Sequence, residues 1–263
     1  MTLFWHTVRL AAQQQITYRA AAFAGLATNF FFGLLRIAVL IALYRGESEV
    51  NGMSLQGAIT FVTISQGLIT FLSIFGNFDL MNSVYNGSIS SDLLRPWGLY
   101  TNWMARGFGR ALVNLVMRGL LLVMMIAPIY PLVIPSTPGQ WLGFLLALAL
   151  GWQVSFAFTF LVNLAAFWTP DARGFGRLAF ILVQLFSGFL MPMRLYPDWF
   201  VQICNLTPFP ALFNTTIEVY LGLISGRELW LALLNQVLWI VILAALSQLV
   251  LRAGVRKLVI QGG

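Results

Sequence analysis

The side chains that most often perform covalent chemistry are scarce in this chain. Its 263 residues include one histidine, His6, and one cysteine, Cys204. An intramembrane hydrolase needs a nucleophile beside a base, or a cluster of metal ligands. His6 and Cys204 are far apart in the sequence and fall on opposite sides of the predicted membrane, so they cannot form a Cys–His dyad. We therefore expect no catalytic residue and no metal site in this chain.

The single lysine, Lys257, gives no phosphate-binding loop. The consensus loop places a lysine directly after a Gly-rich turn, where it reaches the β- and γ-phosphates of a nucleotide. No Gly-rich turn precedes Lys257. The sequence therefore predicts no cofactor in this chain. If ATP drives the protein, a separate polypeptide must bind ATP with Mg and hydrolyse it.

The composition identifies the environment in which the chain folds. Hydrophobic residues make up 59% of it, charged residues only 9%, and the mean hydropathy is +0.84. An ordinary soluble domain is about 45–50% apolar and about 25% charged. These values exclude a disordered chain, a collagen-like rod and a soluble nucleic-acid binder, and one cysteine excludes a disulfide scaffold. The sequence predicts an all-α, polytopic membrane protein.

Six segments are long and apolar enough to cross a bilayer, whose core of about 30 Å needs roughly 20 helical residues. We predict one transmembrane domain over 1–263, with the six-span bundle in 20–251 and a basic cytoplasmic tail in 252–263. The spans are Ala20–Tyr44, Leu55–Gly76, Ala111–Ile134, Trp141–Trp168, Leu178–Leu195 and Leu229–Leu251.

The segment 1–19 precedes the first span and differs from it in character. Its apolar residues are interrupted by His6, Arg9 and the run Gln13–Gln15. A cleavable signal peptide has a continuous apolar region before a small-residue cleavage site, and this segment has none. The pattern predicts an amphipathic helix lying on the membrane surface.

The distribution of basic residues predicts the topology. With the N-terminus in the cytoplasm, ten basic residues fall in inner segments and three in outer segments. Because cytoplasmic loops carry an excess of Lys and Arg, this predicts cytoplasmic N- and C-termini. It also explains the net charge of +7 without nucleic acid. The inner residues are Arg9, Arg19, Arg95, Arg106, Arg110, Arg173, Arg177, Arg252, Arg256 and Lys257, and the outer ones are Arg45, Arg194 and Arg227.

Two inner loops and one outer segment carry further signals. In the inner loop 77–110, Ser90 or Ser91 is predicted to cap a short helical turn that Pro96 ends. The second inner loop, 169–177, places two arginines four residues apart, on one helical face. The outer segment 194–227 is apolar in part but broken by prolines. It predicts short re-entrant or interfacial helices, because irregular backbone at membrane depth must be buried in protein or line water.

The run Gly87–Pro96 reads G-S-I-S-S-D-L-L-R-P. It looks like the G-x-I-x-x-D-L-L-R-P signature of a bacterial branch of daunorubicin-like and viologen-exporter-like multidrug permeases. Together with six spans, an N-terminal surface helix and a broken outer hairpin, the chain resembles the permease subunits of ABC-2 exporters, which have the type V exporter fold. The likeness in architecture covers the whole chain, and the residue-level motif covers ten positions.

The resemblance implies a function and partners. Two permeases pair, as a homodimer or a heterodimer, and each docks an ABC ATPase on the cytoplasmic face of a bacterial inner membrane. The complex exports a hydrophobic or amphipathic, drug-like small molecule, and membrane lipid surrounds it. The residues implied to couple ATPase and permease are Gly87, Ser91, Asp92, Leu93, Leu94, Arg95 and Pro96, with Asp171 and Arg173 in the second loop.

Several residues within or near the spans are candidates for the substrate pathway. Arg36 lies in the first span, where a charge costs about 2.5–3.5 kcal/mol unless it faces protein or water. It either lines a cavity or is bonded at a helix interface, and Glu218 is a possible partner across the outer leaflet. Arg118 in the third span is expected to snorkel inward. The candidate pathway residues are Asn29, Phe32, Arg36, Phe156 and Glu218.

Three alternatives stay open. A permease of the same class could export a lipid or glycolipid. An ion-driven transporter would carry carboxylates or histidine within its spans, whereas seven of the eight acids here fall in loops or at span ends and only Glu218 does not. A passive structural subunit of a heterodimer would have the same sequence features as an active one.

Overall fold

The computed structural model describes residues 2–17, 19–169 and 171–257, and most of them are helical. Four helical stretches are long and apolar enough to cross a membrane: Ala22–Tyr44, Leu99–Ile126, Pro138–Phe167 and Gly226–Val255. They correspond to α2 (Arg19–Tyr44), α6 (Leu99–Asn114) with its continuation, α8 (Pro138–Asn163) with the 3-10 turn η2 (Leu164–Phe167), and α13 (Gly226–Val255). Helix α6 continues through a π-helical turn, η1 (Leu115–Leu120), into α7 (Leu121–Ile126).

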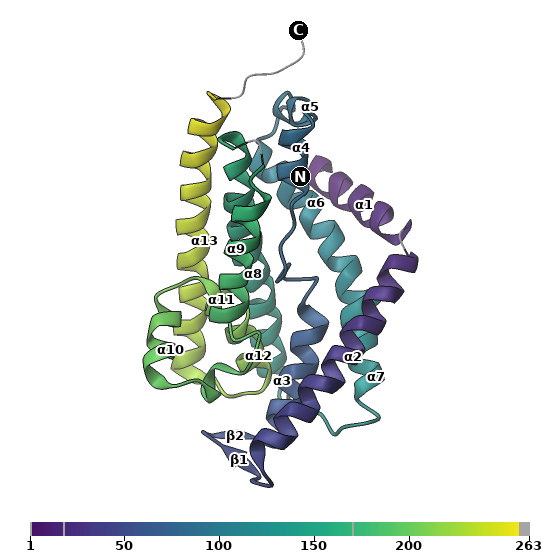
Figure 1. The fold of residues 1–263 in the computed structure, drawn as a ribbon, viewed down its shortest axis with the longest axis vertical. Helices are drawn as coiled ribbons and strands as arrows, with labels where there is room; N and C mark the ends of the chain where they lie inside the picture. Colours follow the sequence, from purple (N-terminus) through teal and green to yellow (C-terminus); the bar gives the residue numbers. More distant parts are fainter. Residues whose placement is uncertain (1, 18, 170, 258–263) are drawn as a thin grey trace.

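The long helices run between two ends of the molecule (Figure 1). At one end lie α1 (Thr2–Thr17), α4 (Asp79–Tyr85), α5 (Ile89–Leu93) and the last turns of α13. At the other end lies a hairpin of β1 (Glu49–Val50) and β2 (Met53–Ser54), paired antiparallel with Val50 opposite Met53. The short helices α10 (Asp198–Asn205), α11 (Phe209–Leu212) and α12 (Asn214–Tyr220) occupy the half nearer the hairpin.

The predicted second and fifth spans are not continuous helices. Helix α3 (Leu55–Leu68) ends well before Gly76, and α9 (Arg173–Phe186) begins before Leu178 and ends before Leu195. Each has 14 residues, or about 21 Å, which is less than the bilayer core. Positive φ angles at Ser73 (+49°), Gly76 (+83°) and Gly188 (+80°) stop the helical path.

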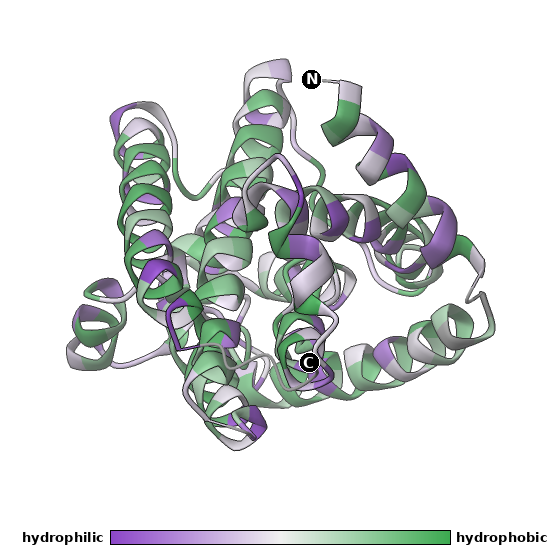
Figure 2. Ribbon diagram, turned by 90° about the horizontal axis from the view of Figure 1, so that it is seen from above, coloured by the Kyte–Doolittle hydropathy of each residue, from purple (hydrophilic) through white to green (hydrophobic). Residues whose placement is uncertain are grey.

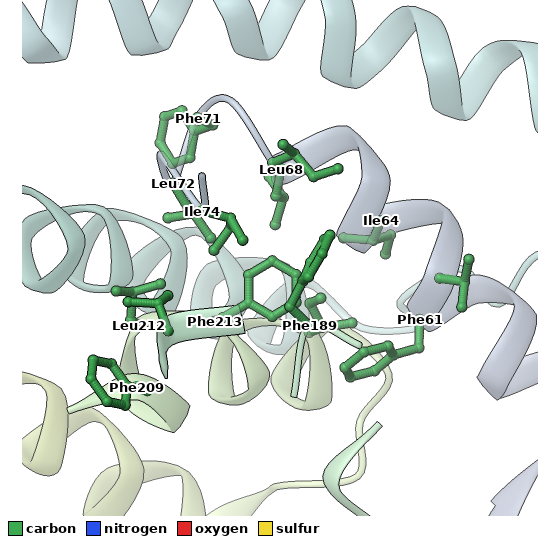
Figure 3. Close-up of a cluster of buried hydrophobic side chains, with 14 of the residues drawn as sticks. Phe61, Ile64, Leu68, Phe71, Leu72, Ile74, Phe189, Phe209, Leu212 and Phe213 are labelled. Carbon is green, nitrogen blue, oxygen red and sulfur yellow. The ribbon is translucent and has the colours of Figure 1, made fainter. Parts of the chain in front are cut away.

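The non-helical stretches that follow α3 and α9 meet in the core. Figure 3 shows Leu72 and Ile74 from the first stretch gathered with Phe189 from the second. Phe213 packs edge-on against Phe189, with ring centroids 5.7 Å apart, and against Phe61 of α3 at 6.5 Å. The two broken segments therefore stabilise each other through one shared apolar cluster.

Helix α1 forms as predicted, but it is fixed to the protein. It packs along α6 and buries Thr7, Val8 and Ala11. A Cβ placed on Gly109 of α6 would lie 2.3 Å from the carbonyl oxygen of Val8, so only glycine permits this approach. Helix α1 is therefore docked on α6 on one side, while Leu3, Trp5 and Leu10 stay exposed on another.

The outward faces of the long helices are apolar, and hydrophobic residues predominate along them in Figure 2. Phe31, Phe32 and Val39 of α2 are exposed, as are Trp230 and Leu234 of α13. A water-soluble monomer rarely exposes apolar surface on this scale. The faces are those of a protein surrounded by lipid.

Local capping explains where two of these helices begin. The hydroxyl of Thr137 accepts a hydrogen bond from the Gln140 amide at 3.2 Å, and Pro138 occupies the first turn of α8. In the same way, Ser54 accepts from the Gly57 amide at 3.0 Å and starts α3 directly after the hairpin.

Candidate functional site

The motif Gly87–Pro96 forms a tight unit with α4. Gly87 has φ of +77°, which glycine adopts readily and other residues rarely do. The hydroxyl of Ser90 donates to the Gly87 carbonyl at 2.9 Å, and that of Ser91 to the Ser88 carbonyl at 2.8 Å. The predicted cap at Ser90 or Ser91 is wrong: the cap position of α5 is Ser88, and its side chain makes no capping bond. Ser90 and Ser91 instead lie inside the turn and bond back to it.

Asp92 fastens this unit to α6. Its carboxylate is only 4% exposed and accepts two hydrogen bonds from Arg106, Nη2 to Oδ1 at 2.7 Å and Nη1 to Oδ2 at 3.0 Å. Arg95 adds an ion pair through Nε at 3.3 Å. A bidentate arginine–carboxylate pair fixes orientation as well as distance. Motif and transmembrane helix are therefore held in one geometry.

A second set of bonds holds α4. Arg110 of α6 pairs with Asp79, which is also the first residue of α4. Asn163 at the end of α8 is buried; its side chain accepts from the Met81 amide at 3.0 Å and donates to the Asn77 carbonyl at 2.7 Å. The unit thus rests on two candidate membrane spans, α6 and α8.

The opposite surface of the unit is exposed and carries two large apolar side chains. Leu94 is 87% exposed and Tyr85 is 70% exposed. Gly87, Ser91, Arg95 and Pro96 are exposed as well, whereas Leu93 is half-buried. Ile89 points the other way and packs with Leu80, Leu99, Trp103 and Leu164. The motif therefore divides into an inward anchoring side and an outward side that faces no part of the described chain.

The second predicted loop lies against the same unit. The Asp171 carboxylate accepts from the Arg173 amide at 3.1 Å and so shapes the turn that starts α9. The guanidinium of Arg173 donates to Asn82 Oδ1 at 3.0 Å and lies 5.8 Å from the ring centroid of Tyr85. Pro170 lies outside the described residues. The structure brings the two predicted coupling segments together at one end of the molecule.

The candidate pathway residues do not converge on one site. Asn29 of α2 donates to the Gln66 carbonyl at 3.3 Å, and Phe32 is exposed on the apolar face of α2. Phe156 of α8 lines a cavity near α6. Arg118 lies in η1 beside Gly25 of α2, and its Nε is buried without a partner.

Arg36 and Glu218 do not pair, so that expectation is wrong. Arg36 donates to the carbonyls of Phe189 and, at 3.0 Å, Leu190, and its guanidinium lies 4.8 Å from the Phe189 ring centroid. Those carbonyls lie beyond the end of α9, where no helical ladder uses them. Glu218 instead accepts from Nε of Arg194 at 3.0 Å. Both predicted residues therefore fasten the broken segments.

The anchoring residues Arg106, Arg110 and Asn163 did not emerge from the sequence as site residues. The two arginines stand four residues apart on one face of α6, yet basic residues near an inner span end already have an explanation in the topology. The presence of two acids, Asp79 and Asp92, in the preceding loop was the available signal that the two arginines have partners.

Comparison with protein families agrees with this architecture. The profile of the ABC-2 family transporter proteins matches residues 30–262, which is most of the chain. Comparisons with curated proteins and with solved structures give no significant match. A helical bundle with four candidate spans and this family match define a multi-pass membrane component of an ABC transporter. The chain belongs to the ABC-2 transporter family.

Proposed function

We propose that the chain is the permease subunit of an ATP-driven exporter and that α4, α5 and the 169–177 loop form its docking surface for the ATPase. One observation carries the proposal: an exposed apolar tip stands on a base bonded to two transmembrane helices. A partner that moves the tip moves α6 and α8 with it. ATP and Mg belong to that partner, and two copies would serve a pair of permeases, identical or different.

Charge supports a protein partner at this end. Leu94 and Tyr85 offer apolar area, and Arg95 and Arg173 flank them with partly exposed guanidiniums. Protein interfaces combine an apolar centre with a polar rim and are enriched in Tyr and Arg. An acidic-rimmed groove on the ATPase would complement this surface.

For the membrane arrangement we infer six crossings. Helices α3 and α9, completed by the non-helical stretches after them, would supply the two crossings beyond the four long ones. The end with α4 and α5 would face the cytoplasm of a bacterial cell, with both chain termini on that side. Helices α10–α12 would then be re-entrant or interfacial at the outer side.

For the cargo we propose a hydrophobic or amphipathic drug-like compound, moved outward, as the daunorubicin-like and viologen-exporter-like branch implies. A lipid or glycolipid is the alternative within the same class. Ion-driven transport is disfavoured because the acids nearest the interior are engaged: Asp79, Asp92 and Glu218 each pair with an arginine.

The test is co-purification from the native host with a tag on this chain, followed by mass spectrometry. Wild type should bring down an ABC ATPase, and Leu94→Glu should lose it. Leu206→Glu is the matched control, because Leu206 is 79% exposed at the end of α10, far from the motif. Equal recovery of the ATPase with both variants would mean that the tip is not the docking surface. Recovery of no ATPase with wild type, in several detergents, would favour an ion-driven transporter.

A further inference from the structure

A partly open cavity lies within the bundle, beside the start of α4. This inner cavity has a volume of about 290 Å³ and is bounded by the non-helical stretch after α3, by α6 and by α8. Gln15 of α1 reaches its rim and donates to Asn114 of α6 at 3.2 Å. Its volume is at the lower end of the range for small-molecule sites, about 300–1,000 Å³. It therefore fits one ring-sized group.

One wall of the inner cavity is aromatic. Trp152 and Phe156 of α8 stack with centroids 5.7 Å apart and planes 17° apart, and Phe160 continues the row one turn on. Trp103 of α6 lines the cavity too. Flat aromatic faces at fixed positions suit a ligand that has a flat apolar face of its own.

The remaining wall is polar but carries no net charge. Asp79 and Arg110 are the charged residues among those that line the cavity, and they pair with each other. An ion entering this space would find no free countercharge, and burying an unpaired charge is costly. The neutral polar residues are Gln15, Thr70, Ser73, Asn77, Asn114, Ser155, Thr159 and Asn163.

Three of the lining residues have buried polar atoms without a partner. They are Thr70 Oγ1, Thr159 Oγ1 and Trp103 Nε1. Buried polar groups are nearly always hydrogen-bonded, so each exception requires an explanation. Thr70 also lies on backbone that has left the helix inside a membrane protein, which is tolerated where it lines a cavity. These atoms have almost no accessible surface, so a molecule in the inner cavity would bond them once their side chains turn toward it.

We infer that the inner cavity binds an uncharged, hydroxyl-bearing ring such as a single sugar unit, either free or as the headgroup of a glycolipid. A sugar ring has an apolar C–H face for the Trp152–Phe156 wall and a rim of hydroxyls, each a donor and an acceptor, for the threonines and amides. The inference rests on the proposed function only in taking this molecule as the cargo, and it favours the glycolipid alternative there over a drug-like compound. The site lies inside one chain and needs no second permease.

Binding can be measured on the full chain in nanodiscs of phosphatidylethanolamine and phosphatidylglycerol that contain monoglucosyl diacylglycerol as the probe. Native mass spectrometry should show the glucosyl lipid retained about tenfold over phosphatidylglycerol. A second arm adds methyl glucoside to discs without the glycolipid; binding there without retention of the lipid assigns the site to a free sugar. Equal retention of both lipids, with no binding of methyl glucoside, would overturn the inference.

Two variants locate the binding. A Cβ at Gly107 would lie 3.5 Å from Phe156 Cδ2, an ordinary contact, so Gly107→Ala fits the fold and only fills the cavity. It should lower probe retention about tenfold, a change of 1.4 kcal/mol. Thr159→Val should act in the same direction. The control is Thr63→Val, because Thr63 is equally internal but donates to the Ile59 carbonyl at 2.9 Å and lies outside the cavity.

Retention unchanged in both Gly107→Ala and Thr159→Val would place any bound lipid elsewhere and reject the site. No ATPase is present in these measurements. A negative result therefore leaves the co-purification test untouched, and a missing ATPase leaves this one untouched.

Discussion

The two ends of the molecule are secured in different ways. At the end with α4 and α5, the Asp92–Arg106 and Asp79–Arg110 pairs join short helices to α6, and Asn163 joins them to α8. At the end nearer the hairpin, the Arg194–Glu218 pair links the turn η3 (Met193–Leu195) to α12 beside a cavity of about 730 Å³. The first end is stiff and suited to transmit movement. The second is tied by one ion pair among the residues that the structure describes and is more suited to change shape.

The largest effect should come from breaking the stiff end at Asp92. Asp92→Asn leaves Arg106 and Arg95 without their carboxylate, and removing one partner of a buried pair costs about 3–5 kcal/mol. We expect about 3 kcal/mol here, since both arginines are partly exposed. Unfolding of the purified protein in detergent would measure it, and substrate-stimulated ATPase activity of the assembled complex should fall as well.

Asp198→Asn is the control for this variant. Asp198 is exposed in the first turn of α10 at the other end, so its loss should cost less than about 1 kcal/mol. Similar losses of unfolding free energy in the two variants would mean that the ion pairs of Asp92 do not stabilise the fold.

Two glycines on α6 sharpen the description of the stiff end. Gly109→Ala drives a methyl into the Val8 carbonyl and should destabilise the docked α1 by about 1–3 kcal/mol. Gly107→Ala, two residues earlier, meets only ordinary contacts and should stabilise the helix by about 0.5–1 kcal/mol. Thermal unfolding of both variants should give shifts of opposite sign. Shifts of the same sign would mean that α1 is not packed on α6 in the membrane.

Breaking the ion pair at the second end should have a smaller effect than breaking the one at Asp92. Glu218→Gln keeps the size of the side chain but removes the charge that Arg194 contacts at 3.0 Å. The change affects one hydrogen bond, whereas Asp92→Asn affects three contacts with arginines. We therefore expect the free energy of unfolding to fall by about 1–2 kcal/mol, with no change in the recovery of the ATPase. A loss as large as that of Asp92→Asn would erase the proposed difference between the ends.

The sequence predicted the helical class and three of the four long stretches, because hydropathy determines them. The prediction for the remaining stretch was wrong in its bounds: the helix runs over Leu99–Ile126 and not over Ala111–Ile134, so its first turns had been assigned to the inner loop. The sequence did not predict the breaks after Leu68 and Phe186, since hydropathy averages over a window and does not register positive φ angles at Ser73 or Gly188. Hydrogen-bonded partners also differ in how far apart they lie in the sequence. Asp92 and Arg106 are 14 residues apart, so their pairing is local in the sequence. Arg36 and Leu190 are 154 residues apart, and the hydrogen bond between them depends on the finished packing.

The close approach of Gly109 to Val8 has a consequence for biosynthesis. Helix α1 leaves the ribosome before α6, and the surface that receives it exists only when α6 has been made, about 100 residues later. At about 5–20 residues per second, α1 waits on the order of 5–20 s for its partner. Its amphipathic sequence gives it a place at the lipid surface during that interval. The amphipathic pattern of α1 would thus serve the chain twice, first at the lipid surface and then in packing on α6.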